Sequence, residues 1–266
     1  MSPTEGAAPF AAGGEAYDAF MGRYAVPLAP LFADVAGVTA GQRVLDVGCG
    51  TGALTGELVR RVGADRVAGC DPSPLLEACR ARHPGTDLRA GVAEDLPFDD
   101  GSCDVALAQL VLHFVTDADR ALREMRRVVV PGGRVAVCVW DAEAMEMLSA
   151  FARAVHAVEG EVPERLRAWP FGRTGELAGF LSSGGLQDVT ETRLRVGCGY
   201  ASVEELWSTL RMAVGPAGVH LAGLSPDGQE RLRTAYLDEV GSPDGPFTLG
   251  ALAHAAVGTV APRDAG

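Results

Sequence analysis

The sequence predicts an α/β fold in which a doubly wound, mostly parallel sheet is covered by helices. Two observations support this prediction. Short apolar runs alternate with segments of helical period between about residue 43 and residue 140. Each run is rich in Val, Ala or Leu and is bounded by Gly, Asp or Pro, which is typical of buried strands. Strand–helix repetition then implies parallel pairing through right-handed crossovers.

The elements of the sheet follow from these patterns. Buried strands are predicted at residues 43–47, 66–70, 104–108 and 134–140, with a weaker candidate at 87–90. After the first strand, Leu54, Leu58 and Val62 recur at helical spacing, and Gly63 provides a C-terminal stop. A later helix is expected to begin with Thr116 as its N-cap and to end before the turn at 131–133.

Further elements flank this region. Helices are predicted at 15–24 and 27–37, separated by a break at Pro27, because proline removes a helical hydrogen bond. Beyond residue 140, helices are predicted at 142–158, 174–183, 202–214 and 227–240, and strands at 188–196 and 247–260. The inserted helices are expected to form a lid over a pocket. We divide the chain into a core at 15–140, a substrate-recognition part of the same domain at 141–260, and flexible tails at 1–14 and 261–266.

Composition excludes several classes of function. The 266 residues are 47% hydrophobic and 22% charged, which is typical of a folded domain. The chain has no lysine, which excludes a Schiff-base lysine and a Walker-type phosphate loop. Its net charge of −12 argues against nucleic acid or anionic lipid as a partner. We see neither a signal peptide nor a run of about 18 apolar residues, and therefore expect a cytoplasmic protein without membrane spans.

Two smaller observations concern origin and metals. Lys, Asn and Ile are all missing, and because these residues share AT-rich codons, a GC-rich, bacterial coding sequence is our hypothesis. The six cysteines form no CxxC pair, which favours reduced, buried thiols over a zinc framework. We therefore expect no metal site.

The strongest motif lies at residues 44–52, where the strand VLDV runs directly into the loop GCGTG and then into a helix. Glycines let a ligand approach the main chain closely. With Ala53 the loop also satisfies the dinucleotide fingerprint, which alone is weak evidence. Asp46 inside the strand suits a cationic ligand better than a pyrophosphate. Asp71, after the next strand, is placed to accept ribose hydroxyls, with a helix N-cap as the alternative.

Five ordered motifs together resemble the class I S-adenosylmethionine-dependent methyltransferases. They are VLDVGCGTG at 44–52, Asp71, AEDLPF at 93–98, DVAL at 104–107 and PGG at 131–133. The similarity covers about residues 15–140 and is strongest to the branch that includes the ubiquinone and menaquinone C-methyltransferases. The resemblance implies a Rossmann-like, mostly parallel seven-stranded sheet, with S-adenosylmethionine as cofactor and S-adenosylhomocysteine as product.

The resemblance also implies a set of cofactor contacts. The loop residues Gly48, Cys49, Gly50 and Gly52 would line the methionine moiety, with Asp46 near its amino group. Asp71 and Pro72 would hold the ribose, and Ala93 and Glu94 the adenine; the family often has Asp where this chain has Val92. Gln109 and Leu110 would approach the methionine end. Tyr17 and Arg23 would close over the cofactor, Arg23 pairing with its carboxylate or, alternatively, being an exposed helix arginine.

Methyl transfer from a sulfonium is an in-line displacement, so orientation of the acceptor matters most. His113 is the candidate catalytic base, with a pocket-shaping histidine as the alternative. Candidate substrate contacts are aromatic and Met residues, each with a core position as the alternative: Phe20, Met21, Trp140, Trp169, Phe171, Trp207 and Met212.

These side chains suit a hydrophobic small molecule, such as a quinone, a polyketide or an aromatic natural product, methylated on O, N or C. The alternatives are a reaction of the same fold without methyl transfer, such as a cyclisation, and a non-catalytic cofactor-binding module. A homodimer is left open.

Overall fold

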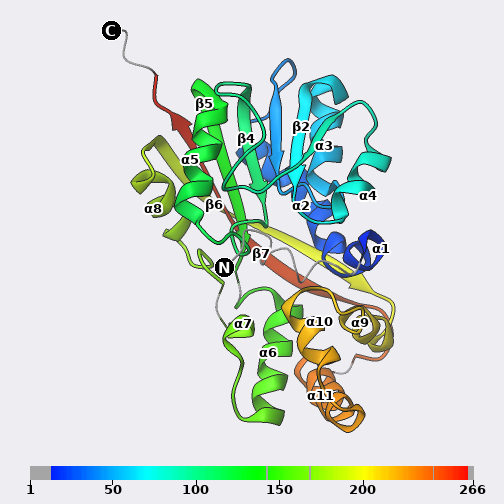
Figure 1. Ribbon diagram of the computed structural model, residues 1–266. Coiled ribbons are helices and arrows are strands. Elements are labelled where there is room, and N and C mark those ends of the chain that lie inside the picture. Colours follow the sequence, from blue (N-terminus) through cyan, green and yellow to red (C-terminus); the bar gives the residue numbers. More distant parts are fainter. Residues whose placement is uncertain (1–12, 142, 168, 242, 263–266) are drawn as a thin grey trace.

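A seven-stranded sheet runs through the upper half of the molecule in the order β3-β2-β1-β4-β5-β7-β6 (Figure 1). The computed structural model describes residues 13–141, 143–167, 169–241 and 243–262. β7 is antiparallel to both of its neighbours, and the other pairs are parallel, which confirms the expected sheet. The strands are β1 (Val44–Val47), β2 (Val67–Asp71), β3 (Asp87–Ala90), β4 (Cys103–Gln109), β5 (Val129–Trp140), β6 (Leu186–Tyr200) and β7 (Phe247–Val260).

Helices cover both faces of this sheet because successive strand residues point to opposite sides. Val44 of β1 packs with α2 (Arg23–Val35) and α3 (Ala53–Val62), whereas its neighbour Leu45 packs with α5 (Ala118–Val128) and α8 (Glu176–Ser183). Three smaller elements complete this half: the 3-10 turn η3 (Ala64–Arg66), the helix α4 (Leu75–Arg82) and the N-terminal helix α1 (Gly14–Tyr17). A π-helical segment, η2 (Asp18–Gly22), joins α1 to α2.

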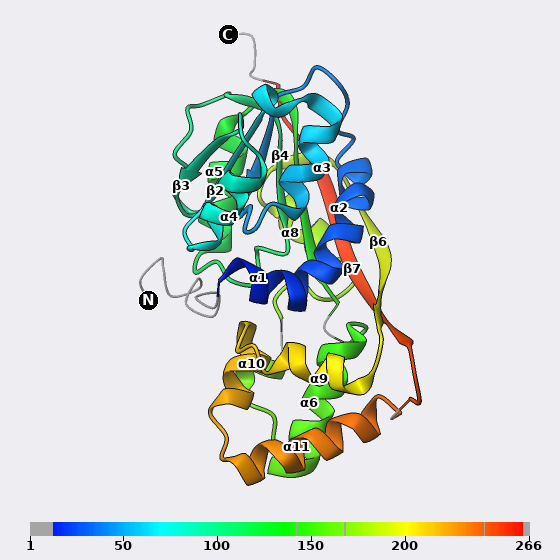
Figure 2. The same ribbon diagram turned by 90° about the vertical axis from the view of Figure 1, so that its right-hand side faces the viewer.

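A second group of helices lies below the carboxyl ends of the central strands (Figures 1 and 2). It consists of α6 (Glu146–Glu159), α7 (Glu164–Arg167), α9 (Val203–Leu210), α10 (Gly215–Ala222) and α11 (Pro226–Glu239). The long strands β6 and β7 extend down to it. One buried apolar cluster runs from Leu28 and Leu58 near the sheet to Phe151 and Leu232 in the lower helices, so the two halves share a core.

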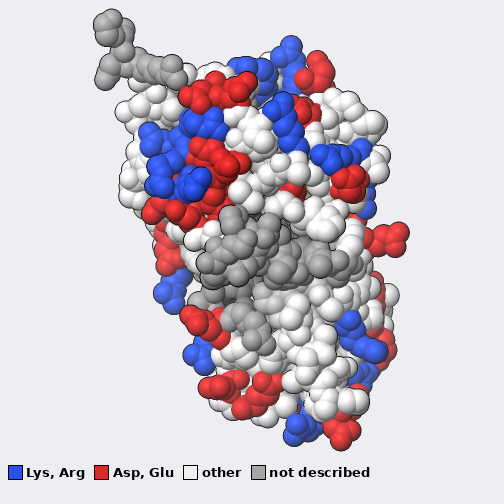
Figure 3. All heavy atoms as spheres, viewed as in Figure 1, with Lys and Arg blue, Asp and Glu red and all other residues white. Residues whose placement is uncertain are grey.

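The surface carries both signs of charge. Figure 3 shows acidic and basic side chains interspersed over the sheet half, and a broader uncharged area over the lower helices. Within the described ranges, no helix combines the length and apolarity that a bilayer crossing requires. The six cysteines are free and buried, as the sequence predicts.

Several predicted boundaries are wrong. α2 continues through Pro27 and Pro30, which stand on its outer side, because its buried face holds Tyr24, Leu28 and Phe32 against the core. The N-cap of α5 is Asp117, which accepts the Arg120 N–H at 2.8 Å.

The segment predicted as one helix at 202–214 ends at Leu210 instead. Ala213 and Gly215 adopt left-handed backbone angles there, which stops the helix, and α10 then starts as a separate helix that the sequence did not predict. α6 begins at Glu146 rather than at 142, because Asp141 accepts two backbone N–H groups in a turn. Of the predicted tails at 1–14 and 261–266, residues 1–12 and 263–266 lie outside the described residues.

Candidate active site

A cavity of about 1270 Å³, partly open to solvent, lies between the carboxyl ends of the strands and the lower helices. This is the edge of an open α/β sheet where ligands bind. The loops after β1, β2, β3 and β4 form one side, and residues of α6, α7 and α10 form the other. η2 and the end of β5 close it laterally. The cavity therefore joins the region of the sequence motifs to the inserted helices.

The glycine loop bends sharply at the upper wall. The N–H groups of Gly48 and Cys49 donate to the Cys70 carbonyl at 2.8 and 3.0 Å, which ties the loop to β2. Gly48 has φ 72°, and a Cβ there would lie 2.4 Å from Val111 Cγ2. A Cβ on Gly50 would meet only Leu75, at 4.0 Å. Gly48 is thus required by its contact with Val111, whereas Gly50 presents an open backbone face to the cavity.

Asp71 lies at the end of β2, is buried, and lines the cavity. Its Oδ2 accepts the Gly50 N–H at 2.9 Å, and its Oδ1 accepts the Ser73 N–H at 2.8 Å and the Ser73 hydroxyl at 2.5 Å. A carboxylate offers about four lone-pair sites, so one remains after these three bonds. Asp71 therefore holds two loops together and still faces the cavity beside Pro72. It does not cap α4, whose N-cap is Pro74.

Negative charge accumulates around this end of the cavity. Asp46 lies behind the glycine loop, outside the lining, where its Oδ2 accepts the Thr55 hydroxyl at 2.7 Å. Burial raises the pKa of Asp46 to about 7, and the Asp71 charge adds to this rise. Burial also raises the pKa of Tyr17 in the cavity wall, and Asp71, Asp18 and Asp46 raise it further. The carboxylates thus create a negative electrostatic potential at Tyr17, which suits a bound cation.

The loop after β3 supplies another polar group. Glu94 is buried and lines the cavity next to Val92 and Ala93. Its Oε1 accepts the Thr116 N–H at 2.7 Å and the Thr116 hydroxyl at 2.9 Å, which is why Thr116 does not cap α5. Glu94 therefore holds this loop to the start of α5.

The turn after β4 is backbone-strained and carries an unpaired acceptor. Leu110 has φ 64°, a conformation that β5 stabilises because its Cys138 carbonyl accepts the Leu110 N–H at 2.8 Å. Gln109 Nε2 donates to the Ala25 carbonyl at 3.1 Å, which fixes the orientation of the amide. Gln109 Oε1 is then buried with no hydrogen-bond partner among the described residues. Both residues line the cavity.

His113 lines the same cavity but is not arranged as a free base. Its Nε2 accepts the backbone N–H of Trp140 at 3.1 Å. Burial lowers the pKa of His113 to about 3, so the ring is neutral near pH 7. This geometry favours the pocket-shaping alternative.

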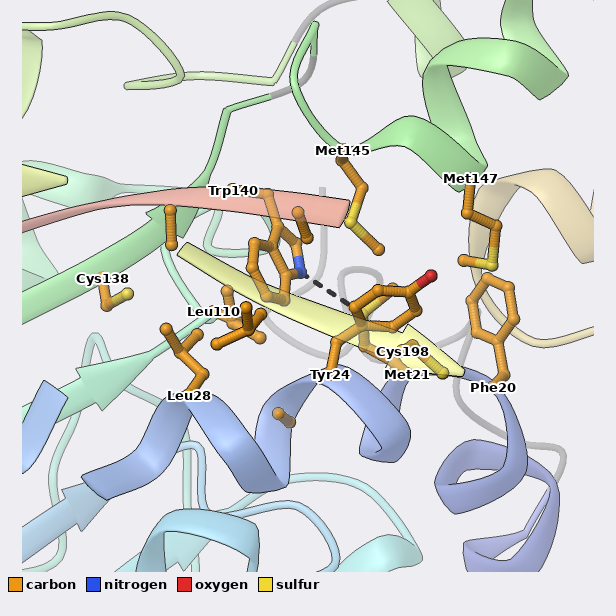
Figure 4. Packing of buried hydrophobic residues seen from close by; sticks show 14 of the residues in the cluster. Phe20, Met21, Tyr24, Leu28, Leu110, Cys138, Trp140, Met145, Met147 and Cys198 are labelled. Atoms are coloured by element: carbon orange, nitrogen blue, oxygen red, sulfur yellow. Dashed lines mark hydrogen bonds between the residues drawn. The ribbon is translucent and has the colours of Figure 1, made fainter. Parts of the chain in front are cut away.

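The lower end of the cavity is apolar. Four of the residues proposed from the sequence as substrate contacts line it: Phe20, Met21, Trp140 and Trp169. The indole N–H of Trp140 donates to Met21 Sδ at 3.2 Å, and Figure 4 shows this bond within the buried cluster. Sequence reasoning missed further lining residues that come from distant segments and carry no motif: Val111, Phe114, Leu148, Phe151, Leu166 and Pro216.

Seven predicted site residues lie outside this cavity, and Asp46 behind the glycine loop is one of them. Arg23 pairs with Glu205 at 2.8 Å and lies over the Tyr200 ring, so it does not reach the site as predicted. Cys49 packs against Leu76 and Cys79, and Gly52 turns toward His83, because both point behind the loop.

The other three such residues were predicted to contact the substrate. Phe171 packs on Phe180 with ring centroids 4.6 Å apart, and Trp207 packs on Tyr236 at 6.1 Å. Met212 is 36% exposed, in the segment between α9 and α10. These placements correct the corresponding predictions.

Comparison with known proteins identifies the family. Residues 45–137 match the model of the methyltransferase domain family. A demethylmenaquinone methyltransferase of Paenarthrobacter aurescens is 35% identical over 183 residues, which cover 62% of this chain and 70% of that relative. The chain belongs to the class I S-adenosylmethionine-dependent methyltransferases. An uncharacterized methyltransferase of Mycobacterium bovis is 48% identical over 103 residues, but the chain covers only 41% of that protein's length.

The fold agrees with this family. The solved structure of phosphoethanolamine N-methyltransferase 2 of Haemonchus contortus, in complex with S-adenosylhomocysteine, matches with a TM-score of 0.55 at 15% identity. The match covers 98% of this chain and 58% of that one. The cofactor of the family is S-adenosylmethionine, and the cavity fits it in three respects: an open glycine backbone, a field suited to a cation, and an unpaired acceptor at Gln109.

Proposed function

We propose that this protein transfers the methyl group of S-adenosylmethionine to an O, N or C nucleophile of a hydrophobic small molecule. The observation that supports the proposal is the division of one cavity into two ends. Asp71, Glu94 and Gln109 lie with the glycine loop at one end, and an aromatic wall forms the other. A cationic nucleoside and an apolar acceptor would then meet inside a single cavity.

At the polar end, we assign residues to parts of the cofactor. Asp71, with Pro72, would accept ribose hydroxyls through its remaining lone pair. Ala93 and Glu94 would border the adenine, since Val92 has no acceptor to offer there. Hydrogen bonds hold the loops that carry these residues. Asp71 accepts the N–H groups of Gly50 and Ser73, and Glu94 accepts the Thr116 N–H.

The methionine moiety would lie along Gly48 and Gly50, with Leu110 and Tyr17 beside it. Gln109 Oε1 would accept a hydrogen bond from the cofactor's ammonium group, because its amide is already oriented by Ala25. Asp46 would act from behind the loop through its charge rather than by contact.

When bound, the cofactor supplies a methyl group already activated on a sulfonium sulfur. The protein's task is then to hold the acceptor on the S–CH₃ axis and to exclude water. Such orientation contributes on the order of 7–11 kcal/mol in well-arranged reactions. Phe20, Met21, Trp140 and Trp169 would provide it here, because they surround the apolar end with large side chains.

The acceptor class we favour is quinone-like or another aromatic natural product. The aromatic rings at the apolar end offer flat surfaces that suit planar molecules. The Paenarthrobacter relative is named for demethylmenaquinone, which is a molecule of this kind. A small-molecule acceptor also agrees with a lining in which the charged groups among the described residues are acidic.

Two measurements test the proposal. Titration calorimetry should detect binding of S-adenosylhomocysteine by the folded protein; no binding would refute the cofactor assignment. Incubation with methyl-labelled S-adenosylmethionine and a panel of apolar phenols, naphthols and hydroquinones should yield labelled product. Unlabelled product with unconsumed cofactor would instead support a reaction without methyl transfer.

A further inference from the structure

His113 has a fixed tautomer. The backbone N–H of Trp140 points at His113 Nε2, with 3.1 Å between the two nitrogens. A nitrogen that accepts an N–H bond carries a lone pair, so in a neutral imidazole the proton must be on the other nitrogen, Nδ1. Because Trp140 is the last residue of β5, this proton position is set by the sheet and not by the ligand.

The Nδ1–H group is an unsatisfied donor. Nδ1 is buried and has no hydrogen-bond partner of acceptable geometry in the part of the chain that the structure describes. The Pro170 carbonyl acts on the ring as a hydrogen-bond acceptor of poor geometry and raises the pKa of His113, which opposes the larger lowering by burial. Leaving a buried donor without an acceptor costs free energy, so an acceptor in the working complex would recover it.

The surroundings of the ring indicate which hydrogen-bond acceptor would bind the Nδ1–H group most strongly. Trp169 lies over His113 with ring centroids 4.9 Å apart, and Phe114 meets it edge-on at 6.1 Å. All three line the apolar end of the cavity. In such surroundings, a hydrogen bond to an oxygen with negative charge is stronger than one to a neutral carbonyl. A phenolate or enolate oxygen would therefore accept the Nδ1–H hydrogen bond in preference to the Pro170 carbonyl.

We propose that His113 is a positioning residue whose Nδ1–H donates to an oxygen of the methyl acceptor, and that the acceptor belongs to the phenol, enol or quinol class. This proposal rests on the proposed function and adds to it the chemical group by which the acceptor is held. The oxygen would be anchored at His113 while the ring lies against Trp169, so that the conjugated nucleophile faces the methyl group. His113 takes up no proton in this arrangement.

Variants separate the two ring nitrogens. His113→Asn keeps a donor near the position of Nδ1, His113→Gln places one near Nε2, and His113→Phe keeps only the ring shape. The probe is 1-naphthol, with naphthalene as the oxygen-free control, bound in the presence of S-adenosylhomocysteine. We expect wild type and His113→Asn to prefer 1-naphthol, and His113→Phe and His113→Gln to lose this preference by about 10-fold or more. His156→Asn, on the exposed side of α6, is the matched control.

A second measurement uses only the wild-type protein and so does not require the variants to be folded. Nitrogen-15 NMR of the wild-type ring should show a protonated Nδ1 and an unprotonated Nε2. Addition of 1-naphthol to the S-adenosylhomocysteine complex should then move the Nδ1–H proton signal downfield. A proton on Nε2, equal affinity of the wild type for 1-naphthol and naphthalene, or a retained preference in His113→Phe would each overturn the proposal.

The two proposals fail in different ways. If S-adenosylhomocysteine does not bind the wild type, the proposed function fails before His113 is tested. If it binds with equal affinity in wild type and all His113 variants, and the preference for 1-naphthol is absent, only the role of His113 is refuted.

Discussion

The two ends of the cavity are built by different means. The polar end consists of short loops that follow four neighbouring strands, and hydrogen bonds such as Asp71 to Gly50 hold these loops to one another. The apolar end consists of side chains from η2, β5, α6, α7 and α10, which are held by packing and by single contacts such as Trp140 to Met21. Substitutions at the polar end should therefore cause large losses of cofactor affinity. Substitutions at the apolar end should cause smaller losses of affinity for the methyl acceptor.

The largest effect is expected at Gly48. Gly48→Ala combines a left-handed φ of 72° with a Cβ 2.4 Å from Val111, which should lower the free energy of unfolding by on the order of 3 kcal/mol. Gly132→Ala is the matched control, since its φ is 79° but nothing lies within 4 Å of the added Cβ. Gly132→Ala should lower the free energy of unfolding by about 1–2 kcal/mol. Denaturant titration checks both, and equal losses would show that the contact with Val111 is unimportant.

Asp71→Ala comes next, with a loss of about 2 kcal/mol in S-adenosylhomocysteine binding, or about 30-fold in Kd, because charge-assisted hydrogen bonds to the ribose disappear. Ser73→Ala removes one bond to Asp71 and leaves the carboxylate in place. It should change the calorimetric Kd by less than about threefold. If both variants weaken binding equally, Asp71 serves only to hold the loops.

Asp46 makes cofactor affinity depend on pH. Burial raises the pKa of Asp46 to about 7, so the free protein is partly protonated there at neutral pH. The ammonium group of the bound cofactor favours the ionised form of Asp46, so cofactor binding should release a proton. The affinity for the cofactor should therefore increase by about tenfold between pH 6 and pH 8. Asp46→Asn should abolish this slope in S-adenosylhomocysteine titrations.

In the free protein, Asp46 should make the free energy of unfolding decrease with rising pH, whereas it makes cofactor affinity increase. The raised pKa means that the folded state retains its proton after the unfolded state has lost it, at about pH 4. The free energy of unfolding should therefore fall from pH 4 to pH 7 through this group, and Asp46→Asn should flatten that part of the curve. A rise over the same range that depends on Asp46 would contradict the assignment.

The smallest effect is expected at the apolar end. Trp169→Ala should weaken 1-naphthol binding by about fivefold, since one aromatic contact is lost, and should leave the Kd of S-adenosylhomocysteine within about twofold. Met212→Ala, outside the cavity and exposed, should change neither. A large loss of cofactor affinity in Trp169→Ala would mean that the two ends are not separate.

The same contrast explains what could be predicted from the sequence. The strands and the polar loops follow from local patterns, because Gly48, Asp71 and Glu94 act within a few residues of strand ends. The apolar wall could be anticipated only as a set of aromatic residues. Trp169 lies in the cavity and Trp207 does not, and their local sequences do not distinguish them. The burial of each depends on how the segment after α7 and the helix α9 pack.

Arg23 shows a second limit. Its position in an N-terminal helix suited a carboxylate partner, but the ion pair with Glu205 is formed across 182 residues of sequence. No local pattern predicts such a pairing. The same holds for the bond between Trp140 and His113. This bond decides the tautomer of a residue that the sequence indicated as a candidate base or a pocket-shaping histidine.

A crystal structure with S-adenosylhomocysteine would show how the cofactor lies between the two ends of the cavity. We predict that the ribose will contact Asp71, that the adenine will lie by Ala93 and Glu94, and that the sulfur will face the apolar end between Trp140 and His113. A ligand bound elsewhere, or one whose sulfur points away from that end, would contradict the account.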